Sequence, residues 1–309
     1  MTSRQTSGVS ARTPPAFSAV ATRRVLERAC DAVGLDASDA VLLRLGENAI
    51  YRLTRTPVVV RIARTMNYWS DACKEVAVAK WLASHRVPAV TVAGPVEQPV
   101  EAAGHPVTFW RYIDGRVAAR HEIGVLGTLL RQLHALPAPT GFRLPALDIL
   151  GRVEERIDAA SVPTSDKTFL LHRLSELGAQ LATLRWRLAS TVVHGDAHDH
   201  NVMIEDGQPL LIDFERFAWG QPEWDLAVTA TEYLTGGWWT AEEYATFADA
   251  YGFDVTEWDG FSVVLAVNEL KMTTWIMQNI AESAEIADEY EARMHTLRTG
   301  RVDRSWRPF

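Results

Sequence analysis

Three side chains that end in oxygen atoms stand at short intervals in the second half of the chain. Asp196 follows an apolar segment, Asn201 comes five residues later, and Asp213 follows a second apolar segment. Apolar residues before each polar cluster indicate that the cluster lies where a buried strand ends, so the three side chains can converge. Phosphoryl transfer from ATP needs a carboxylate that takes the hydroxyl proton and oxygen ligands for Mg²⁺. Asp196 fits the first role, and Asn201 with Asp213 fits the second.

These residues resemble the motifs of the aminoglycoside phosphotransferase family, bacterial small-molecule kinases related to choline kinases and, more remotely, to protein kinases. The matching segments are residues 194–196 with Asn201, residues 212–215 and residues 220–227. An isolated His-Gly-Asp would prove little, so the resemblance depends on the whole ordered set. It implies an α+β, protein-kinase-like two-lobed fold, with a small antiparallel-sheet N-lobe that carries one main helix and a larger, mostly helical C-lobe.

Two segments of the N-terminal part look like the family's nucleotide-binding elements. Gly46 and Asn48 lie in a turn between two expected strands, where glycine lets backbone N–H groups approach phosphate. A plain hairpin turn would look the same. The strand that ends at the hinge matches residues 107–112, so backbone groups near Trp110 and Arg111 would meet adenine.

Arg61 occupies the place of the strand residue that holds the α- and β-phosphates, and Glu75 on the next helix matches its ion-pair partner. The kinase fold more widely uses lysine there. Arginine is not equivalent, because its planar fork binds phosphate bidentately and reaches differently. Arginine at this strand is a familiar variation among these small-molecule kinases, so the assignment of Arg61 stands.

Other polar residues near the motifs have structural interpretations. The ring of His194 is expected to bond backbone rather than substrate, and Asp225 is expected to cap or brace the catalytic loop. Glu215 could reach a substrate amine, contact a metal-bound water or merely end a strand. A zinc site at His194, His198 and His200 is a weaker alternative, because no fitting fourth ligand lies nearby.

The last third of the chain offers candidates for the acceptor site. Trp238 and Trp239 follow two glycines and could stack on a sugar or contact an amine, although most tryptophans here are expected in the core. Glu269 lies in a long apolar helix, so it needs a partner, which is either substrate or another helix. Residues 221–300 hold fifteen Asp and Glu against three basic residues, a net −12 within a total of −8. This charge is either a solvated face or a surface that attracts a cationic small molecule.

The elements that position these residues can be outlined from periodicity. We expect a flexible tail over residues 1–16, a nucleotide-binding N-terminal lobe over 17–112 and a catalytic and substrate-binding C-terminal lobe over 113–309. The first lobe should hold a helix at 17–33, a meander of strands at 40–45, 49–53 and 58–62, a helix at 70–85, and strands near 91–92 and at 107–113. The second should hold helices at 122–136, 150–160, 167–188, 223–235, 240–251 and 258–299.

Composition narrows the class of protein. No apolar run in the 309 residues is long enough to cross a bilayer, and the polar start lacks a signal-peptide core, so we expect a cytoplasmic protein with no membrane partner. Cys30 and Cys73 lie in expected helices and are interpreted as core thiols, not a disulfide or zinc framework. The acidic balance disfavours a nucleic-acid partner. A monomer or a homodimer is expected.

The leading hypothesis is therefore a kinase that uses ATP, with GTP as an alternative donor, and Mg²⁺ to phosphorylate a hydroxyl of an aminoglycoside or other cationic antibiotic. A metabolite kinase for choline, homoserine or an amino sugar is the second enzymatic hypothesis. An inactive kinase-like binding module is disfavoured, because Asp196, Asn201 and Asp213 are all present. A protein-substrate kinase is disfavoured too, because no segment resembles its activation segment.

Overall fold

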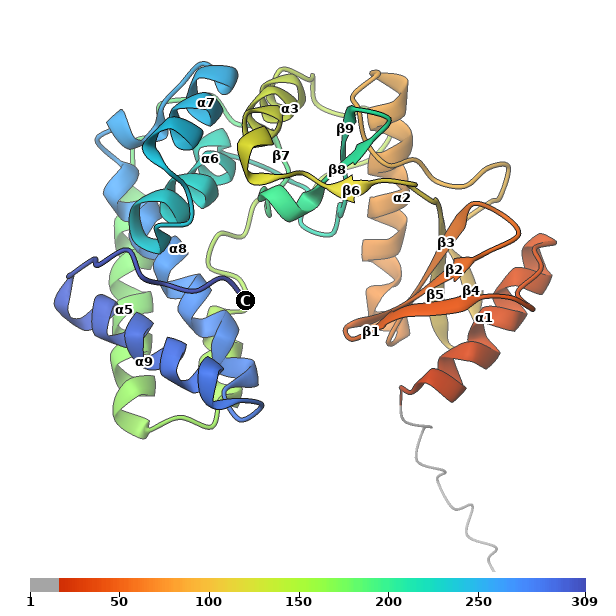
Figure 1. The fold of residues 1–309 in the computed structure, drawn as a ribbon, viewed down its shortest axis with the longest axis horizontal. Helices are drawn as coiled ribbons and strands as arrows, with labels where there is room; N and C mark the ends of the chain where they lie inside the picture. The colour runs from red at the N-terminus through yellow and green to blue at the C-terminus, as the bar shows by residue number, and fades with distance from the viewer. Residues whose placement is uncertain (1–16) are drawn as a thin grey trace, which may run out of the picture. The chain divides into compact units, whose positions relative to one another are not determined.

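A computed structural model describes residues 17–309, and the tail predicted for residues 1–16 lies outside them. The chain divides into two compact units (Figure 1). The first ends at Val76 and resumes over Val92–Tyr112, and the second comprises Ala77–Thr91 and Ile113–Phe309. The division cuts helix α2 (Trp69–Ser84) between Val76 and Ala77. An N-terminal antiparallel sheet and a mostly helical C-terminal part confirm the predicted α+β class.

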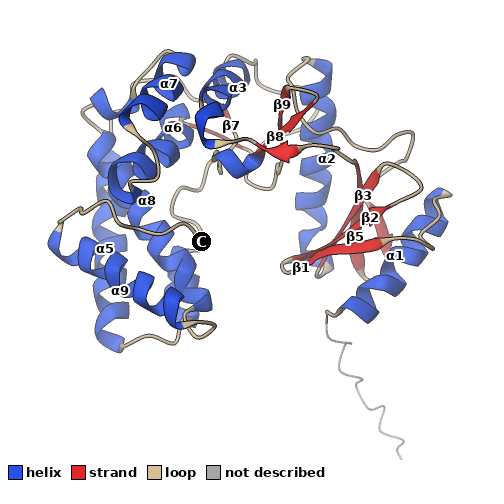
Figure 2. Ribbon diagram, viewed as in Figure 1, coloured by secondary structure: helices blue, strands red, loops and turns tan. Residues whose placement is uncertain are grey.

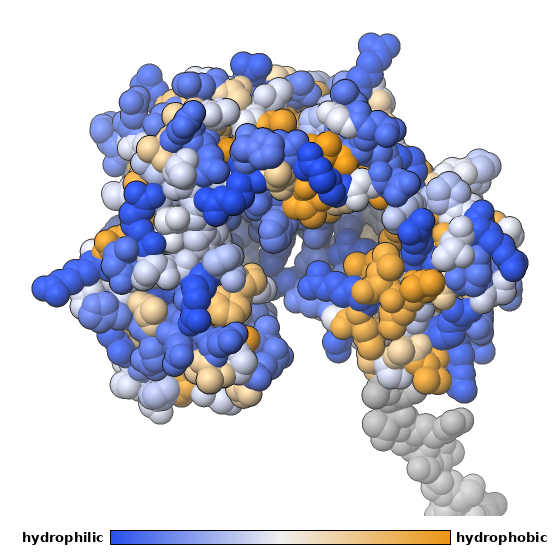
Figure 3. All heavy atoms as spheres, in the orientation of Figure 1, coloured by the Kyte–Doolittle hydropathy of each residue, from blue (hydrophilic) through white to orange (hydrophobic). Residues whose placement is uncertain are grey.

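The sheet of the first unit is antiparallel, with the strand order β1-β2-β3-β5-β4. Its first three strands form the predicted meander, and β4 was not foreseen. A bulge between Leu42 and Arg44 shifts the register of the edge strand β1, whose Val41, Leu43 and Leu45 are exposed (Figure 3). The strands are β1 (Val41–Leu45), β2 (Asn48–Leu53), β3 (Val58–Ala63), β4 (Val100–Ala102) and β5 (His105–Arg111).

Helix α1 (Ala19–Val33) forms the other half of this core. The hydroxyl of Ser18 caps its N-terminus, and Gly34 ends it at a φ of 73°, a left-handed conformation that glycine adopts without strain. The apolar face of α1, which includes Leu26, is buried in one cluster with sheet residues such as Val60. This packing holds the strand that carries Arg61.

Helices make up most of the second unit (Figure 2). They are α3 (Gly124–His134), α4 (Val153–Ala159), α5 (Thr164–Thr183), α6 (Pro222–Thr231), α7 (Ala241–Tyr251), α8 (Phe261–Ile276) and α9 (Ala284–Thr299). Short helical turns are η1 (Met66–Tyr68) in the first unit, and η2 (Arg120–Glu122), η3 (Asp199–Asn201), the π-helical η4 (Glu232–Gly236), η5 (Val255–Glu257) and η6 (Met277–Asn279) in the second.

Two small antiparallel sheets lie among these helices. One pairs β10 with β7, and the other has the order β6-β8-β9. Their strands are β6 (Arg116–Val117), β7 (Thr191–Val193), β8 (Val202–Glu205), β9 (Gln208–Leu211) and β10 (Ala218–Gly220). The polar clusters around Asp196 and Asp213 directly follow β7 and β9, as the apolar segments before them predicted.

Two predicted elements differ from the structure. The single helix expected over residues 258–299 is wrong, because α8 and α9 are separate helices with η6 between them. The hydroxyl of Ser283 accepts a hydrogen bond from the Ile286 N–H and starts a new helix, a capping signal that continuous helical spacing concealed. Near residues 91–92 the structure has only an isolated bridge between Val92 and Trp110 instead of a strand. No helix within residues 17–309 is long and apolar enough to span a membrane.

Candidate active site

The loop after β7 is held by a buried carboxylate. Asp225, fully buried on α6, accepts hydrogen bonds from the backbone N–H groups of His194 at 2.7 Å and Gly195 at 2.8 Å. The His134 ring lies 3.0 Å from the same carboxylate. Gly195 has a φ of 81°, and a Cβ there would come within 2.3 Å of the Arg216 carbonyl, so only glycine allows this close approach. The loop backbone is therefore fixed independently of its exposed side chains.

Asp196 projects from this fixed loop with its side chain about half exposed, at 55%. In the same loop, His198 Nε2 lies 3.9 Å from the Asp196 carboxylate. Burial lowers the pKa of His198, and the negative charge of Asp196 opposes that effect. The Asp196 carboxylate has no hydrogen-bond partner within residues 17–309, so it can accept one from a ligand.

Asn201 is nearly buried, and its amide is oriented by the loop. Its Nδ2 donates to the backbone carbonyl of Asp196 at 2.8 Å and lies 3.1 Å from His198 Nε2. Its Oδ1 makes no hydrogen bond with the described residues. An amide oxygen that is held in place but not engaged suits a hard cation such as Mg²⁺.

Asp213 is tied to the same loop through its neighbour. The Ile212 N–H donates to the Asn201 carbonyl at 3.0 Å, and His194 Nε2 lies 3.0 Å from the Ile212 carbonyl. Asp213 itself has a φ of 62°, a strained conformation for a residue with a side chain, and such strain often occurs at functional sites. Among the described residues, its Oδ1 accepts only a long, 3.4 Å bond from the Glu215 N–H. One amide and one carboxylate are a ligand set that leaves positions on Mg²⁺ for phosphate and water.

The candidates in the first unit form a connected group of their own. Arg61 Nη1 donates to Glu75 at 2.5 Å, and both side chains are largely buried. The Asn48 amide, oriented to suit both partners, accepts from Arg61 Nε at 3.0 Å and Nη2 at 2.9 Å. The carbonyl of Gly46 accepts from Arg64 at 2.8 Å. The structure thus joins Asn48, Arg61 and Glu75 directly.

The two hinge candidates lie at the end of β5. Trp110 is buried and pairs with Val59 in the ladder between β3 and β5, and Arg111 pairs with Val58. The Trp110 indole donates to the Thr108 hydroxyl at 2.9 Å. Both residues lie in the strand that the sequence pattern predicted, and their contact with adenine stays a prediction.

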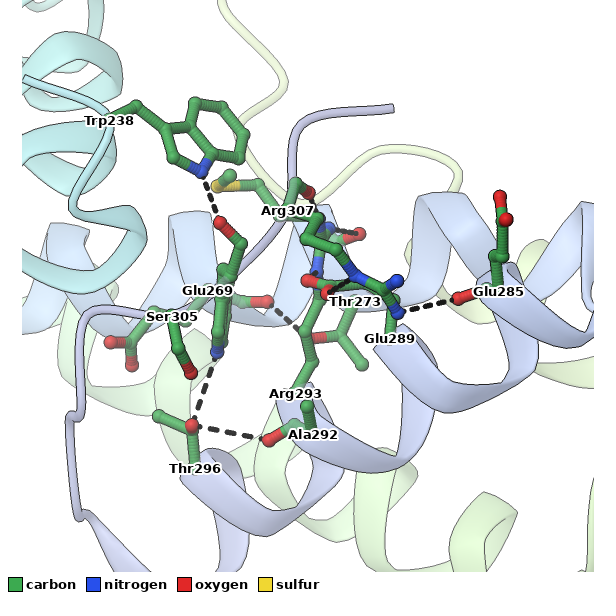
Figure 4. Close-up of polar contacts among 12 residues, drawn as sticks. Trp238, Glu269, Thr273, Glu285, Glu289, Ala292, Arg293, Thr296, Ser305 and Arg307 are labelled. Atoms are coloured by element: carbon green, nitrogen blue, oxygen red, sulfur yellow. Dashed lines mark hydrogen bonds and ion pairs between the residues drawn. The ribbon is translucent and has the colours of Figure 1, made fainter.

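The acceptor-side candidates make contacts within the second unit. Trp239 is buried, and its indole donates to Glu232 at 2.9 Å. Glu269 accepts from the Thr235 hydroxyl at 2.7 Å. The Trp238 indole donates to the Trp306 carbonyl, and Figure 4 shows Trp238 and Glu269 among the polar contacts of this part. Glu215 forms an ion pair with Arg152 at 3.2 Å. These four side chains are therefore on two different parts of the unit, with Glu215 near the metal candidates.

Sequence reasoning missed Glu232, a buried acid in the π-helical turn η4. Burial raises its pKa to about 8, the hydrogen bond from Trp239 opposes the change, and the negative charges of Asp199 and Asp196 add to it. No local pattern distinguishes this glutamate from an exposed one. Within residues 17–309, no group of three or more His, Cys, Asp or Glu side chains is arranged to hold a metal ion.

Comparison with known proteins assigns the chain to a class. The model of the phosphotransferase enzyme family matches residues 40–261, which is well over half of the chain. The chain therefore belongs to the phosphotransferase enzyme family, and it is a kinase that acts on small molecules. The motif-based resemblance is thereby confirmed. Comparison with curated proteins gave no match.

Solved structures share the fold at low identity. An amicoumacin kinase, hAmiN, solved with AMP-PNP, Ca²⁺ and Ami, has a TM-score of 0.71 at 15% identity, covering 92% of this chain and 96% of that one. A microcompartment-associated aminopropanol kinase has a TM-score of 0.68 at 17% identity, covering 90% and 94%. Choline kinase LicA from Streptococcus pneumoniae has 0.64 at 15%, covering 90% and 99%. At these identities the likeness extends to the fold alone.

Proposed function

We propose that this kinase transfers the γ-phosphoryl group of ATP to a hydroxyl of a small molecule, with Asp196 as the general base and Asn201 and Asp213 as Mg²⁺ ligands. The observation that supports the proposal is the set of hydrogen bonds that holds the loop around these residues. Buried Asp225 and His194 hold the backbone, while the Asp196 carboxylate and the Asn201 amide oxygen have no hydrogen-bond partner among residues 17–309. Such preorganised, unengaged oxygens are what phosphoryl transfer requires.

The proposed chemistry assigns one step to each side chain. The acceptor hydroxyl donates a hydrogen bond to Asp196, which takes its proton as the new O–P bond forms and the bond to the leaving ADP oxygen breaks. Asn201 and Asp213 would hold Mg²⁺, which neutralises triphosphate charge when bound. His194 and Asp225 keep the loop in place and do not touch the reacting atoms.

The nucleotide part of the proposal rests on the first unit. Arg61 would contact phosphate while its pairing with Glu75 and Asn48 fixes the guanidinium. Gly46 would let the backbone of its turn approach phosphate, and backbone groups at Trp110 and Arg111 would meet the base. ATP is the proposed phosphoryl donor and GTP is the alternative. A competition experiment with the two nucleotides decides which one the protein prefers.

For the acceptor we propose a cationic antibiotic such as an aminoglycoside. The net charge of −12 over residues 221–300 supports an amine-bearing acceptor, with Glu215, Glu269, Trp238 and Trp239 as the candidate contacts. A metabolite kinase for choline, homoserine or an amino sugar is the second candidate, and the aminopropanol and choline kinases among the structural neighbours favour testing it. A turnover screen across antibiotics and these metabolites separates the two.

The class-level experiment compares two substitutions. Asp196→Ala should reduce turnover about 10³-fold while leaving Mg-ATP affinity unchanged, because the base acts on the acceptor. Asp213→Ala should weaken Mg-ATP affinity measured by calorimetry, and the effect should vanish when Mg²⁺ is removed. Near-normal turnover by Asp196→Ala would remove it as the base. Unchanged affinity in Asp213→Ala would remove it as a ligand, and wild-type protein that binds Mg-ATP without any turnover would favour the inactive binding module.

A further inference from the structure

Lys271 on α8 is a largely buried cation near the catalytic loop. Its Nζ donates to the Ile149 carbonyl at 2.7 Å and lies 4.8 Å from the centre of the Trp224 ring. The Trp224 indole in turn donates to the Gly195 carbonyl at 3.2 Å. Lys271 is therefore linked through one aromatic ring to the residue that directly precedes Asp196.

Arg216 approaches the same glycine from another side. Its backbone carbonyl packs so closely on Gly195 that a Cβ there would come within 2.3 Å. Its half-exposed guanidinium makes no hydrogen bond, ion pair or ring contact within residues 17–309. The backbone and Cβ of Arg216 thus pack on Gly195, and Lys271 is linked to the same glycine through Trp224. Within residues 17–309, neither cation has a carboxylate partner within salt-bridge distance.

Burial and neighbouring charges both act on Lys271. Burial is the main cause that lowers the pKa of Lys271, to about 8, and the positive charges of Arg216 and Arg156 lower it further. The negative charges of Asp196 and Asp148 oppose them. Cationic side chains lie close together near the candidate base, and the pKa of one of them, a lysine, is lowered. This arrangement favours binding of an anion.

We propose that Lys271 and Arg216 form an oxyanion site beside Asp196, which binds a carboxylate or phosphate group during the reaction. The inference rests on the proposed function, because Asp196 defines where the acceptor hydroxyl lies. Two sources could supply the oxyanion: an acid group carried by the acceptor, or the phosphoryl group in transfer. A planar guanidinium and an ammonium together suit either group.

The site contrasts with the acidic balance of residues 221–300. An acceptor that carries only amines gains nothing from Lys271 and Arg216, since like charges repel. If the acceptor is the source, it is a zwitterion, in which a carboxylate meets the two cations near the reacting hydroxyl. If the phosphoryl group is the source, the two cations stabilise its charge as it leaves ADP.

The first experiment measures oxyanion binding at this point of the structure. Inorganic phosphate is titrated into the full chain, and the indole N–H signal of Trp224, assigned with Trp224→Phe, reports binding by NMR. The signal should move saturably in the wild type, and Arg216→Ala and Lys271→Met should weaken phosphate binding about tenfold, as loss of a charge-assisted hydrogen bond does. Arg216→Lys should restore part of the affinity. Arg185→Ala, which removes an exposed arginine elsewhere in the unit, is the matched control and should change nothing.

Two further measurements separate the sources. L-homoserine should displace phosphate, and L-homoserine amide should not, if the acceptor supplies the oxyanion. If the phosphoryl group supplies it, neither should displace phosphate, and Arg216→Ala should slow Mg-ATP hydrolysis to water about tenfold or more. Phosphate that leaves the Trp224 signal unmoved, or that binds Arg216→Ala as tightly as wild type, overturns the oxyanion site. Mg-ATP affinity that still depends on Asp213 would then leave the proposed function intact.

Discussion

Two parts of the second unit hold their polar residues in opposite ways. Between residues 191 and 225, the side chains of Asp196 and Asp213 are exposed, and the Oδ1 of buried Asn201 makes no hydrogen bond with the described residues. Other, buried groups fix the backbone beneath them. Between residues 232 and 309, the candidate side chains themselves make the structural contacts. The Trp238 indole donates to the Trp306 carbonyl, and Arg304 donates to the Trp239 carbonyl. Glu269 accepts from the Thr235 hydroxyl.

In the catalytic loop, the residues proposed for chemistry are not those that stabilise the fold. In the C-terminal part, the candidate residues also stabilise the fold. In the catalytic loop, the Asp196 carboxylate makes no hydrogen bond with the described residues. Replacing it should therefore leave the free energy of unfolding nearly unchanged. In the C-terminal part, Arg293 donates to the Met272 and Arg307 carbonyls and pairs with buried Glu289, so replacing Arg293 also loosens packing. Stability measurements can therefore test the comparison without knowledge of the acceptor.

The largest loss of stability is expected at Asp225, the buried residue that holds the catalytic loop. Asp225→Ala leaves the N–H groups of His194 and Gly195 and the ring of His134 without their buried acceptor, which should cost about 3–5 kcal/mol. Asp196→Ala, in the same loop, should change stability by less than about 0.5 kcal/mol. Urea unfolding followed by circular dichroism measures both. If both variants lost the same free energy of unfolding, Asp225 would not hold the loop more than Asp196 does, and the distinction between them would be wrong.

The next effect concerns the C-terminal residues. Trp306 is buried at 3% exposure, and its indole donates to the Thr296 hydroxyl at 3.1 Å. Trp306→Ala should destabilise the protein by about 3 kcal/mol, because a large buried ring is lost. Trp306→Phe keeps most of the ring and should lose about 1 kcal/mol, mainly the hydrogen bond. Thermal unfolding checks both, and an unchanged melting temperature in Trp306→Ala would mean that this segment does not pack as described.

Sequence reasoning succeeded where the signal was carried by neighbouring residues. The roles of His194 and Asp225 in holding the loop follow from a motif whose parts stand within about thirty residues of one another, and the observed hydrogen bonds have that geometry. The contact of Trp238 with Trp306 spans 68 residues, and no local pattern specifies it. No local pattern pairs Arg216 with Lys271 either. Only folding packs Arg216 on Gly195 and links Lys271 to that glycine through Trp224.

A smaller effect should distinguish two glycines that share a left-handed backbone. Gly237 has a φ of 70°, and a Cβ there would come within 2.4 Å of the Arg304 carbonyl, whereas Gly252 has a φ of 93° with nothing within 4 Å. Gly252→Ala should cost only the backbone strain, about 1 kcal/mol, and Gly237→Ala should cost about 1–2 kcal/mol more, because the C-terminal segment must shift. Urea midpoints compare them. Identical midpoints would show that residues 300–309 do not press on this turn.

A pH dependence joins the two regions. The folded protein keeps Glu232 protonated up to about pH 8, because of its burial and the charges of Asp199 and Asp196, whereas the unfolded chain releases that proton near its ordinary pKa of 4.5. Its stabilising contribution is therefore complete below the unfolded pKa and is lost as the pH rises through about 8. Glu232→Gln cannot titrate, so wild type should lose stability relative to this variant between about pH 5 and about pH 9. Urea unfolding across that range measures the difference. A difference that does not change with pH would mean that Glu232 is open to water, and that Trp239 does not seal the turn over it.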